Sequence, residues 1–138
     1  MTAPAAELQK AVFDALGADP TLTGALGADR IFAQAPANVT FPYITFGRTS
    51  VYDWSTGTEK GTEQLFTLHI WSKAKGNKEA LEIMEMARWV IEDKSLPLDT
   101  QHLVNMRLEF AEERYDEDQA VHHGMLRFRA ITEEADSE

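Results

Sequence analysis

The stretch of sequence that decides the fold is VNMRLEFAEERYDEDQAVHHGMLRFRAI, residues 104–131. Apolar residues alternate with polar ones at both of its ends: Val104, Met106, Leu108 and Phe110 at the first, and Leu126, Phe128 and Ala130 at the second. A period of two indicates strands that are buried on one face and solvated on the other. The polar connection between the two runs predicts that they pair as an antiparallel hairpin.

The apolar faces also predict the register of this hairpin. Because directly opposed side chains share one face of a sheet, only pairings with an even residue sum bury both apolar sets. We therefore expect Leu108 to face Phe128 and Phe110 to face Leu126, with the turn near Asp118.

The same register has two consequences for the polar residues. It puts Glu109 opposite Arg127, a favourable cross-strand ion pair. It also puts the sequence YDEDQAVHHG, residues 115–124, at the tip of the hairpin, where we expect it to be acidic and exposed.

Two further strands are predicted earlier in the chain, at Tyr43–Val51 and Gln64–Trp71. In the second strand the apolar residues again alternate with polar ones: Phe66, Leu68 and Ile70 share one face. Residues 33–42 contain two prolines and an asparagine and are typical of a loop. The polar insert between the strands, residues 53–63, is expected to form a flexible hairpin loop, longer than a tight turn.

Helical spacing of apolar residues appears in three places. A first helix is predicted from Pro4 to Leu16, and a short second one begins at Pro20 and ends at a nearby glycine. The main helix should run from about Asn77 to Asp93, since asparagine is a good N-cap, an apolar stripe continues to Ile91, and Pro97 forbids much extension beyond Leu96.

Together these segments predict an α+β fold formed by one domain, residues 1–138. Its mainly antiparallel sheet has a long helix and an N-terminal helix packed on one face, which is the simplest way to bury the apolar faces of such elements.

The composition of the chain excludes several classes of function. The chain has 138 residues and no cysteine, so thiolate metal sites and cysteine nucleophiles are excluded. We find no secretory signal and no apolar run of the roughly 20 residues that span a bilayer, and we expect synthesis in the cytoplasm. The formal net charge is −10, and residues 109–138 contribute ten acidic and three basic residues, or −7 of it. Nucleic-acid binding as the main task is therefore not expected.

Catalytic and cofactor motifs are not found. The four histidines, His69, His102, His122 and His123, do not form a zinc-protease motif, and there is no nucleophile elbow or phosphate-binding loop. We expect no catalytic residue, no metal and no cofactor. One alternative stays open, in which His122 or His123 joins Asp116 and Asp118 to hold a divalent cation in a small enzyme.

Several side chains are instead typical of interfaces between proteins. Trp89 is predicted to point away from the buried face of the main helix, and aromatic residues and methionine are enriched in interface cores. The candidate contacts on this helix and on the two hairpin loops are Tyr52, Trp54, Lys60, Met86, Trp89, Asp116, Asp118 and His122. The alternative interpretation is that Trp89 packs under a loop and Trp54 covers the edge of the sheet.

Three segments resemble the tail-completion or tail-terminator family of long-tailed bacteriophages, which also occurs in prophages and gene transfer agents. They are RIFAQAPANVTFPYITFG at residues 30–47, LHIWSKAKGNKEALEI at residues 68–83 and HHGMLRFRAITEE at residues 122–134. The resembling segments occur in the right order and span nearly the whole chain.

This resemblance implies a structural protein of the virion or of a phage-like particle. It would form a ring, typically a hexamer, at the neck-proximal end of the tail. The ring would stop polymerisation of the major tail tube protein and dock onto the head–tail connector. DNA would pass through the lumen without specific binding, and no membrane would be involved. The alternatives are a connector stopper or adaptor, a tail tube subunit, the small metal-dependent enzyme, or a cytosolic adaptor unrelated to phages.

Overall fold

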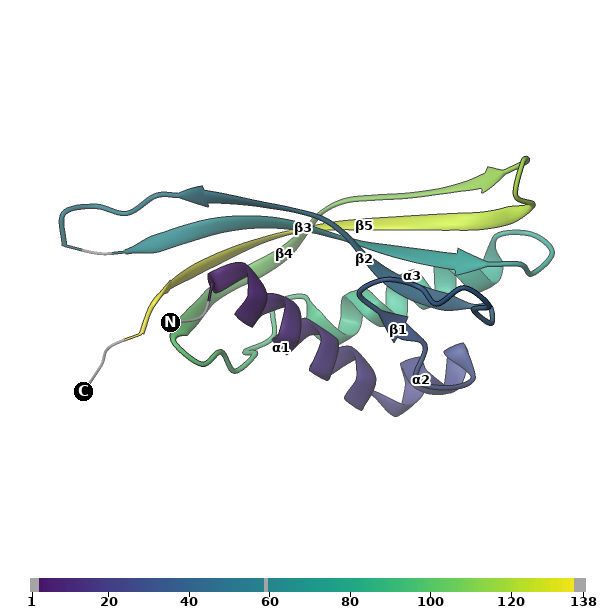
Figure 1. Ribbon diagram of the computed structural model, residues 1–138, viewed down its shortest axis with the longest axis horizontal. Helices are drawn as coiled ribbons and strands as arrows, with labels where there is room; N and C mark the ends of the chain where they lie inside the picture. Colours follow the sequence, from purple (N-terminus) through teal and green to yellow (C-terminus); the bar gives the residue numbers. More distant parts are fainter. Residues whose placement is uncertain (1–2, 59, 136–138) are drawn as a thin grey trace.

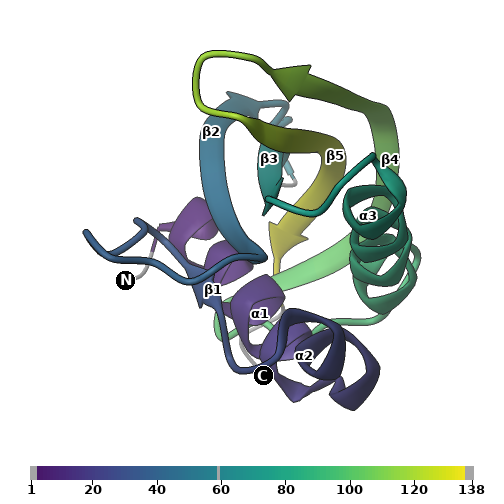
Figure 2. The same cartoon turned by 90° about the vertical axis from the view of Figure 1, so that its right-hand side faces the viewer.

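The computed structural model describes residues 3–58 and 60–135 of the chain. In this part the elements are α1 (Pro4–Ala18), α2 (Pro20–Leu26), β1 (Ile31–Phe32), β2 (Tyr43–Asp53), β3 (Gly61–Ser72), α3 (Lys78–Ile91), β4 (Gln101–Asp116) and β5 (Val121–Glu134). The strands form one sheet in the order β1-β2-β3-β5-β4. The helices lie together on one face of this twisted sheet, as predicted (Figures 1 and 2).

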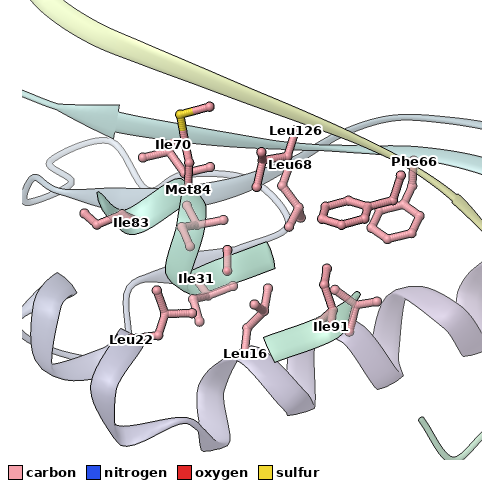
Figure 3. Packing of buried hydrophobic residues seen from close by; sticks show 14 of the residues in the cluster. Leu16, Leu22, Ile31, Phe66, Leu68, Ile70, Ile83, Met84, Ile91 and Leu126 are labelled. Atoms are coloured by element: carbon pink, nitrogen blue, oxygen red, sulfur yellow. The ribbon is translucent and has the colours of Figure 1, made fainter. Parts of the chain in front are cut away.

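The hydrophobic core lies between the sheet and the helices. Phe66 of β3 stacks on Phe128 of β5, with ring centroids 5.3 Å apart. The predicted inward residues Leu68 and Ile70 of β3 are fully buried, and Figure 3 shows them beside side chains of the helix layer. The period of two therefore identified the buried face of β3 and β5 correctly.

The two N-terminal helices are confirmed, although α1 continues two residues past its predicted end at Leu16. Pro4 begins α1, and the side chain of Asp19 caps α2 by accepting a hydrogen bond from the Leu22 amide at 2.9 Å. Gly27 ends α2 in a left-handed conformation with φ 87°, which glycine adopts without a steric penalty. No helix in the described part is long and apolar enough to cross a membrane.

The expectation of a long helix is wrong. The main helix, α3, has 14 residues, because the chain leaves the helical conformation at Glu92. Asp93 then takes a positive φ of 57°, and its amide donates to the Met106 carbonyl of β4 at 2.9 Å. The helix thus ends where its last turn docks onto the sheet. Asn77 lies at the N-cap position, but its side chain makes no capping hydrogen bond.

The expectation of a mainly antiparallel sheet also needs correction, since the sheet is mixed. β1 pairs with β2 in parallel, with Ile31 opposite Ile44 and Phe32 opposite Thr45. A strand of two residues has no detectable period, so the sequence did not reveal it. Arg30 fixes its position, because its guanidinium donates to the carbonyls of Leu26 and Phe41.

The predicted register of the β4–β5 hairpin is correct at Leu108, which faces Phe128, but wrong beyond it. A bulge at residue 109 removes Glu109 from the ladder, so that Phe110 faces Arg127 instead of Leu126. A second irregularity follows Leu103. The two irregularities turn Val104 and Phe110 toward solvent, with exposed fractions of 46% and 41%. The even-sum rule failed because it assumes an uninterrupted ladder. The turn itself is centred near Asp118, as predicted.

A buried carboxylate links the helix layer to the start of β4. Glu7 of α1 accepts hydrogen bonds from the backbone amide and the hydroxyl of Thr100, although it is only 5% exposed. Burial raises the pKa of Glu7, but these hydrogen bonds outweigh that effect and keep the pKa below its usual value.

The stacked pair in the core gives a stability prediction. Replacing the fully buried Phe128 by alanine removes the ring that stacks on Phe66 and leaves a cavity, so we expect the free energy of unfolding to fall by about 3–5 kcal/mol. Urea denaturation followed by circular dichroism measures this. The control is Phe110→Ala on the neighbouring strand, which should cost about 1 kcal/mol or less because the ring is partly exposed. Equal losses in both variants would contradict the assignment of the buried face.

Candidate assembly surfaces

Trp89 is the most exposed of the large apolar side chains in the described part, with 69% of its surface accessible. It lies beside a groove of about 770 Å³ between α3 and the α1–α2 corner. Met86 and Val90 of α3 and Ala15 and Ala18 of α1 line this groove. The prediction that Trp89 points outward is therefore confirmed, and Met86 contributes to the same surface.

A second hollow of about 330 Å³ is lined by Trp89 together with Arg88, Glu92 and Asp93. Trp89 therefore lines both hollows. The ammonium group of Lys94 lies 5.7 Å from the ring centroid, within the range of a cation–π contact. Tryptophan and methionine are enriched in the cores of protein interfaces, and tryptophan is common among the residues that dominate binding. We call Trp89, Met86 and the larger groove the Trp89 surface.

The candidates Tyr52, Trp54 and Lys60 lie at the end of the β2–β3 hairpin. Tyr52 is 55% exposed. Trp54 is half-buried because its ring packs against Gly61, where a Cβ atom would lie 2.0 Å from the indole. Trp54 thus covers the sheet, which was the alternative interpretation, while Tyr52 and Lys60 stay accessible.

The candidates Asp116, Asp118 and His122 lie at the opposite end of the molecule, around the β4–β5 turn (Figure 1). The imidazole Nδ1 of His122 is 2.8 Å from a carboxylate oxygen of Glu113, and both side chains are nearly buried. Asp116 instead accepts a hydrogen bond from the Gln119 amide. Within residues 3–58 and 60–135, no group of three or more His, Asp or Glu side chains is placed to hold a metal ion, so the small-enzyme alternative gains no support.

Sequence reasoning missed a cluster on the face of the sheet that the helices leave uncovered. His69 Nδ1 lies 2.7 Å from His123 Nε2, and the ring of Trp71 stacks on His123 with centroids 4.0 Å apart. The indole N–H of Trp71 donates to Thr45, and Tyr43 lies beside Trp71. Each of the three resembling segments contributes a residue to this His–Trp cluster. The presence of these aromatic and histidine residues in all three segments was the signal in the sequence that could have indicated the cluster.

Two glycines are required by close packing, Gly47 on the face of the His–Trp cluster and Gly124 on the face that the helices cover. A Cβ atom at Gly47 would lie 2.3 Å from His69 Nε2, and one at Gly124 would lie 2.5 Å from the sulfur of Met84. Gly47 thus lets His69 lie flat on β2, and Gly124 lets α3 approach β5. The two histidines bond to each other and pack against Trp71 and Gly47, so the cluster is structural.

Burial lowers the pKa of both histidines, and in His123 the neighbouring His69 lowers it further. The hydrogen bond between the two rings needs one neutral nitrogen as the acceptor. The pair is therefore compatible with the fold when neutral and is disrupted when both rings gain a proton.

Comparison with known proteins agrees with the resemblance noted in the sequence. The family model described as "Tail completion protein gp17" matches residues 10–133. Among solved structures, a chain from the virion of a native gene transfer agent particle superposes with a TM-score of 0.87 at 26% sequence identity. The match covers 96% of this chain and 99% of that chain. The search of curated proteins gives no match.

The His–Trp cluster predicts how stability depends on pH. Because the folded pKa values lie below the unfolded value of about 6.5, the unfolded chain binds more protons as the pH falls. The contribution of the neutral His69–His123 pair to the free energy of unfolding should be complete above pH 6.5 and be lost as the pH falls below it. Urea midpoints measured between pH 7.5 and pH 5 test this. His123→Phe keeps a ring on Trp71 and should reduce the loss.

The matched control is His102→Phe, because His102 is exposed and lies outside the cluster. It should keep the pH dependence of the original chain. The assignment would be wrong if His123→Phe lost as much stability on acidification as His102→Phe.

Proposed function

Because this chain belongs to the tail completion protein gp17 family, we propose that it is the terminator subunit of a phage-type tail. It is a structural protein of the tail in a virion or phage-like particle, and we propose no catalytic role. Its subunits would form a ring, most simply a hexamer, at the head-proximal end of the tail tube. The ring would stop polymerisation of the tube protein and give the head–tail connector a surface on which to dock.

The observation that carries this proposal is the family match over residues 10–133, which includes β1 to β4, all but the last residue of β5 and most of α1. The similar chain in a gene transfer agent virion supports it, because the two chains agree over almost their full lengths.

The geometry supports a ring. A ring with cyclic symmetry needs a heterologous contact, in which one surface of a subunit meets a different surface of the next. The Trp89 surface lies on the helix layer, while Tyr52 and Lys60 lie at one end of the sheet and Asp116 and Asp118 at the other. Three separate surfaces suffice for contacts with two neighbours and with the tube.

The charge of the chain supports passage of DNA through the ring. Each subunit carries a net charge of −10, or about −60 for a hexamer, and like charges repel a polyanion. DNA would then pass the ring without being held by it.

The Trp89 surface gives the first test. Trp89→Glu puts a charge at the centre of the proposed contact, so ring assembly on tube ends should be lost, as measured by light scattering and electron microscopy. The free energy of unfolding should change by about 1 kcal/mol or less, because the side chain is exposed. Leu81→Glu, a change at an exposed residue of the same helix outside the groove, is the control. A ring that survives Trp89→Glu would exclude Trp89 from the interface.

A second test addresses the terminator role itself. Purified chain added to polymerising tube protein should shorten the tubes in proportion to its concentration, since each bound ring blocks one growing end. Tube lengths in negative-stain micrographs measure this. A connector protein would leave the length distribution unchanged, and a tube subunit would be incorporated along the tube or would polymerise alone. Either result would overturn the terminator assignment.

A further inference from the structure

The two outer strands of the sheet are each covered over only part of their length. β1 covers β2 at Ile44 and Thr45 and extends no further. The end of α3 covers β4 near its middle, where the Glu92 carboxylate accepts from the Leu108 amide at 2.7 Å and the Asp93 amide donates to Met106. We call the uncovered parts the open half of β2 (residues 46–53) and the open half of β4 (residues 109–116).

Both open halves are long, exposed and partly apolar. Val51 and Tyr52 on β2, and Phe110 and Tyr115 on β4, are between 41% and 55% exposed. Within residues 3–58 and 60–135, no other strand or loop bonds to the outward backbone groups of either half. Edge strands of soluble proteins are usually short, charged or covered, because open edges pair with other chains. Two open edges of this kind therefore indicate a binding surface for another strand.

Strand direction makes the two open halves suitable partners for each other. β2 is antiparallel to β3, β3 to β5, and β5 to β4, so three reversals leave β2 and β4 running in opposite directions. The open half of β4 in one subunit can thus pair in an antiparallel way with the open half of β2 in a rotated copy. Every subunit keeps the same orientation about the ring axis, as cyclic symmetry requires.

Charge favours this pairing over the pairing of two identical edges. The open half of β4 has four acidic residues, Glu109, Glu112, Glu113 and Asp116, against the single Arg114, a net charge of −3. The open half of β2 has one of each sign and is neutral, and its exposed Arg48 has no ion pair within the described residues. Two β4 edges would oppose like charges, whereas β2 offers β4 a free guanidinium.

We propose that neighbouring subunits of the ring join by strand addition, the open half of β4 in one copy pairing with the open half of β2 in the next. This inference rests on the proposed ring. The two open halves do not lie directly across the sheet from each other. Followed from strand to strand, the residue pairs connect Val51 through Gln64 of β3 to Met106, and Phe46 through Leu68 of β3 to Ala111. Gln64 and Leu68 are four residues apart, or roughly 14 Å, so each neighbour is displaced along the strands by about that distance.

Cysteine cross-linking tests the pairing directly, because the chain has no cysteine of its own. Val51→Cys and Ala111→Cys change exposed residues that lie on the same face of the sheet in the two open halves. In rings assembled on tube ends, a short bis-maleimide should link the Val51–Ala111 double-cysteine variant into covalent oligomers from the dimer up to the full ring, which a denaturing gel separates. Each single variant should stay unlinked, and a mixture of the two should give dimers.

The control replaces Ala111→Cys with Val104→Cys, which is 46% exposed but lies outside the open half of β4, and it should give no cross-linked oligomers. If the Val51–Ala111 variant forms rings but no cross-links, strand addition is wrong, while the proposed ring itself still stands. Absence of any ring in the unmodified protein would overturn the proposed function, and this inference with it.

A second variant tests the same contact without cross-linking. Lysine on an edge strand opposes strand addition, so Val51→Lys together with Ala111→Lys should abolish ring assembly. The urea midpoint should stay near that of the unmodified chain, because both residues are exposed. Normal rings from this double-lysine variant would also contradict the proposal.

Discussion

The pairing of β3 with β5 is the constraint on which the rest of the structure depends. These two strands are joined over twelve consecutive residue pairs without any shift of register, from Gly61 opposite Glu133 to Ser72 opposite His122. The stacked rings of Phe66 and Phe128 lie on the face that the helices cover, and the His69–His123 pair lies on the other. Because this ladder is continuous, residues distant in sequence are held at fixed positions on both faces. It also carries the two hairpins to opposite ends of the molecule (Figure 1).

The outer strands differ from this centre in a way that bears on assembly. β2 and β4 both contain register shifts, whereas β3 and β5 pair without one. A bulge bends and twists its strand, and at residue 109 it separates the part of β4 that α3 covers from the part that is open. The helix layer likewise leaves Trp89 accessible beside its groove. These exposed features are the ones through which the proposed ring would contact its neighbours.

Much of the fold could be predicted because apolar periodicity reflects burial directly. The strands around Phe66 and Phe128, the start of α2 at Pro20 and the outward position of Trp89 all follow from local sequence. The features that sequence reasoning missed depend on tertiary contacts. Nothing local predicts that Ile31 and Phe32 form a parallel strand, that Asp93 leaves the helix to bond β4, or that a bulge removes Glu109 from the ladder. The His–Trp cluster was missed for the same reason, since His69 and His123 are 54 residues apart. The interface candidates remain predictions, because a single subunit does not show its neighbours.

Electron microscopy of intact tailed particles that carry this subunit tests the central claim most directly. An affinity label on the chain should appear once per particle, as a single ring between the end of the tail tube and the neck. The reconstructed ring should hold six copies of the fold described above, each joined to the next by a heterologous contact. A label distributed along the tube, located on the head, or absent from assembled particles would contradict the assignment of this chain as a tail terminator.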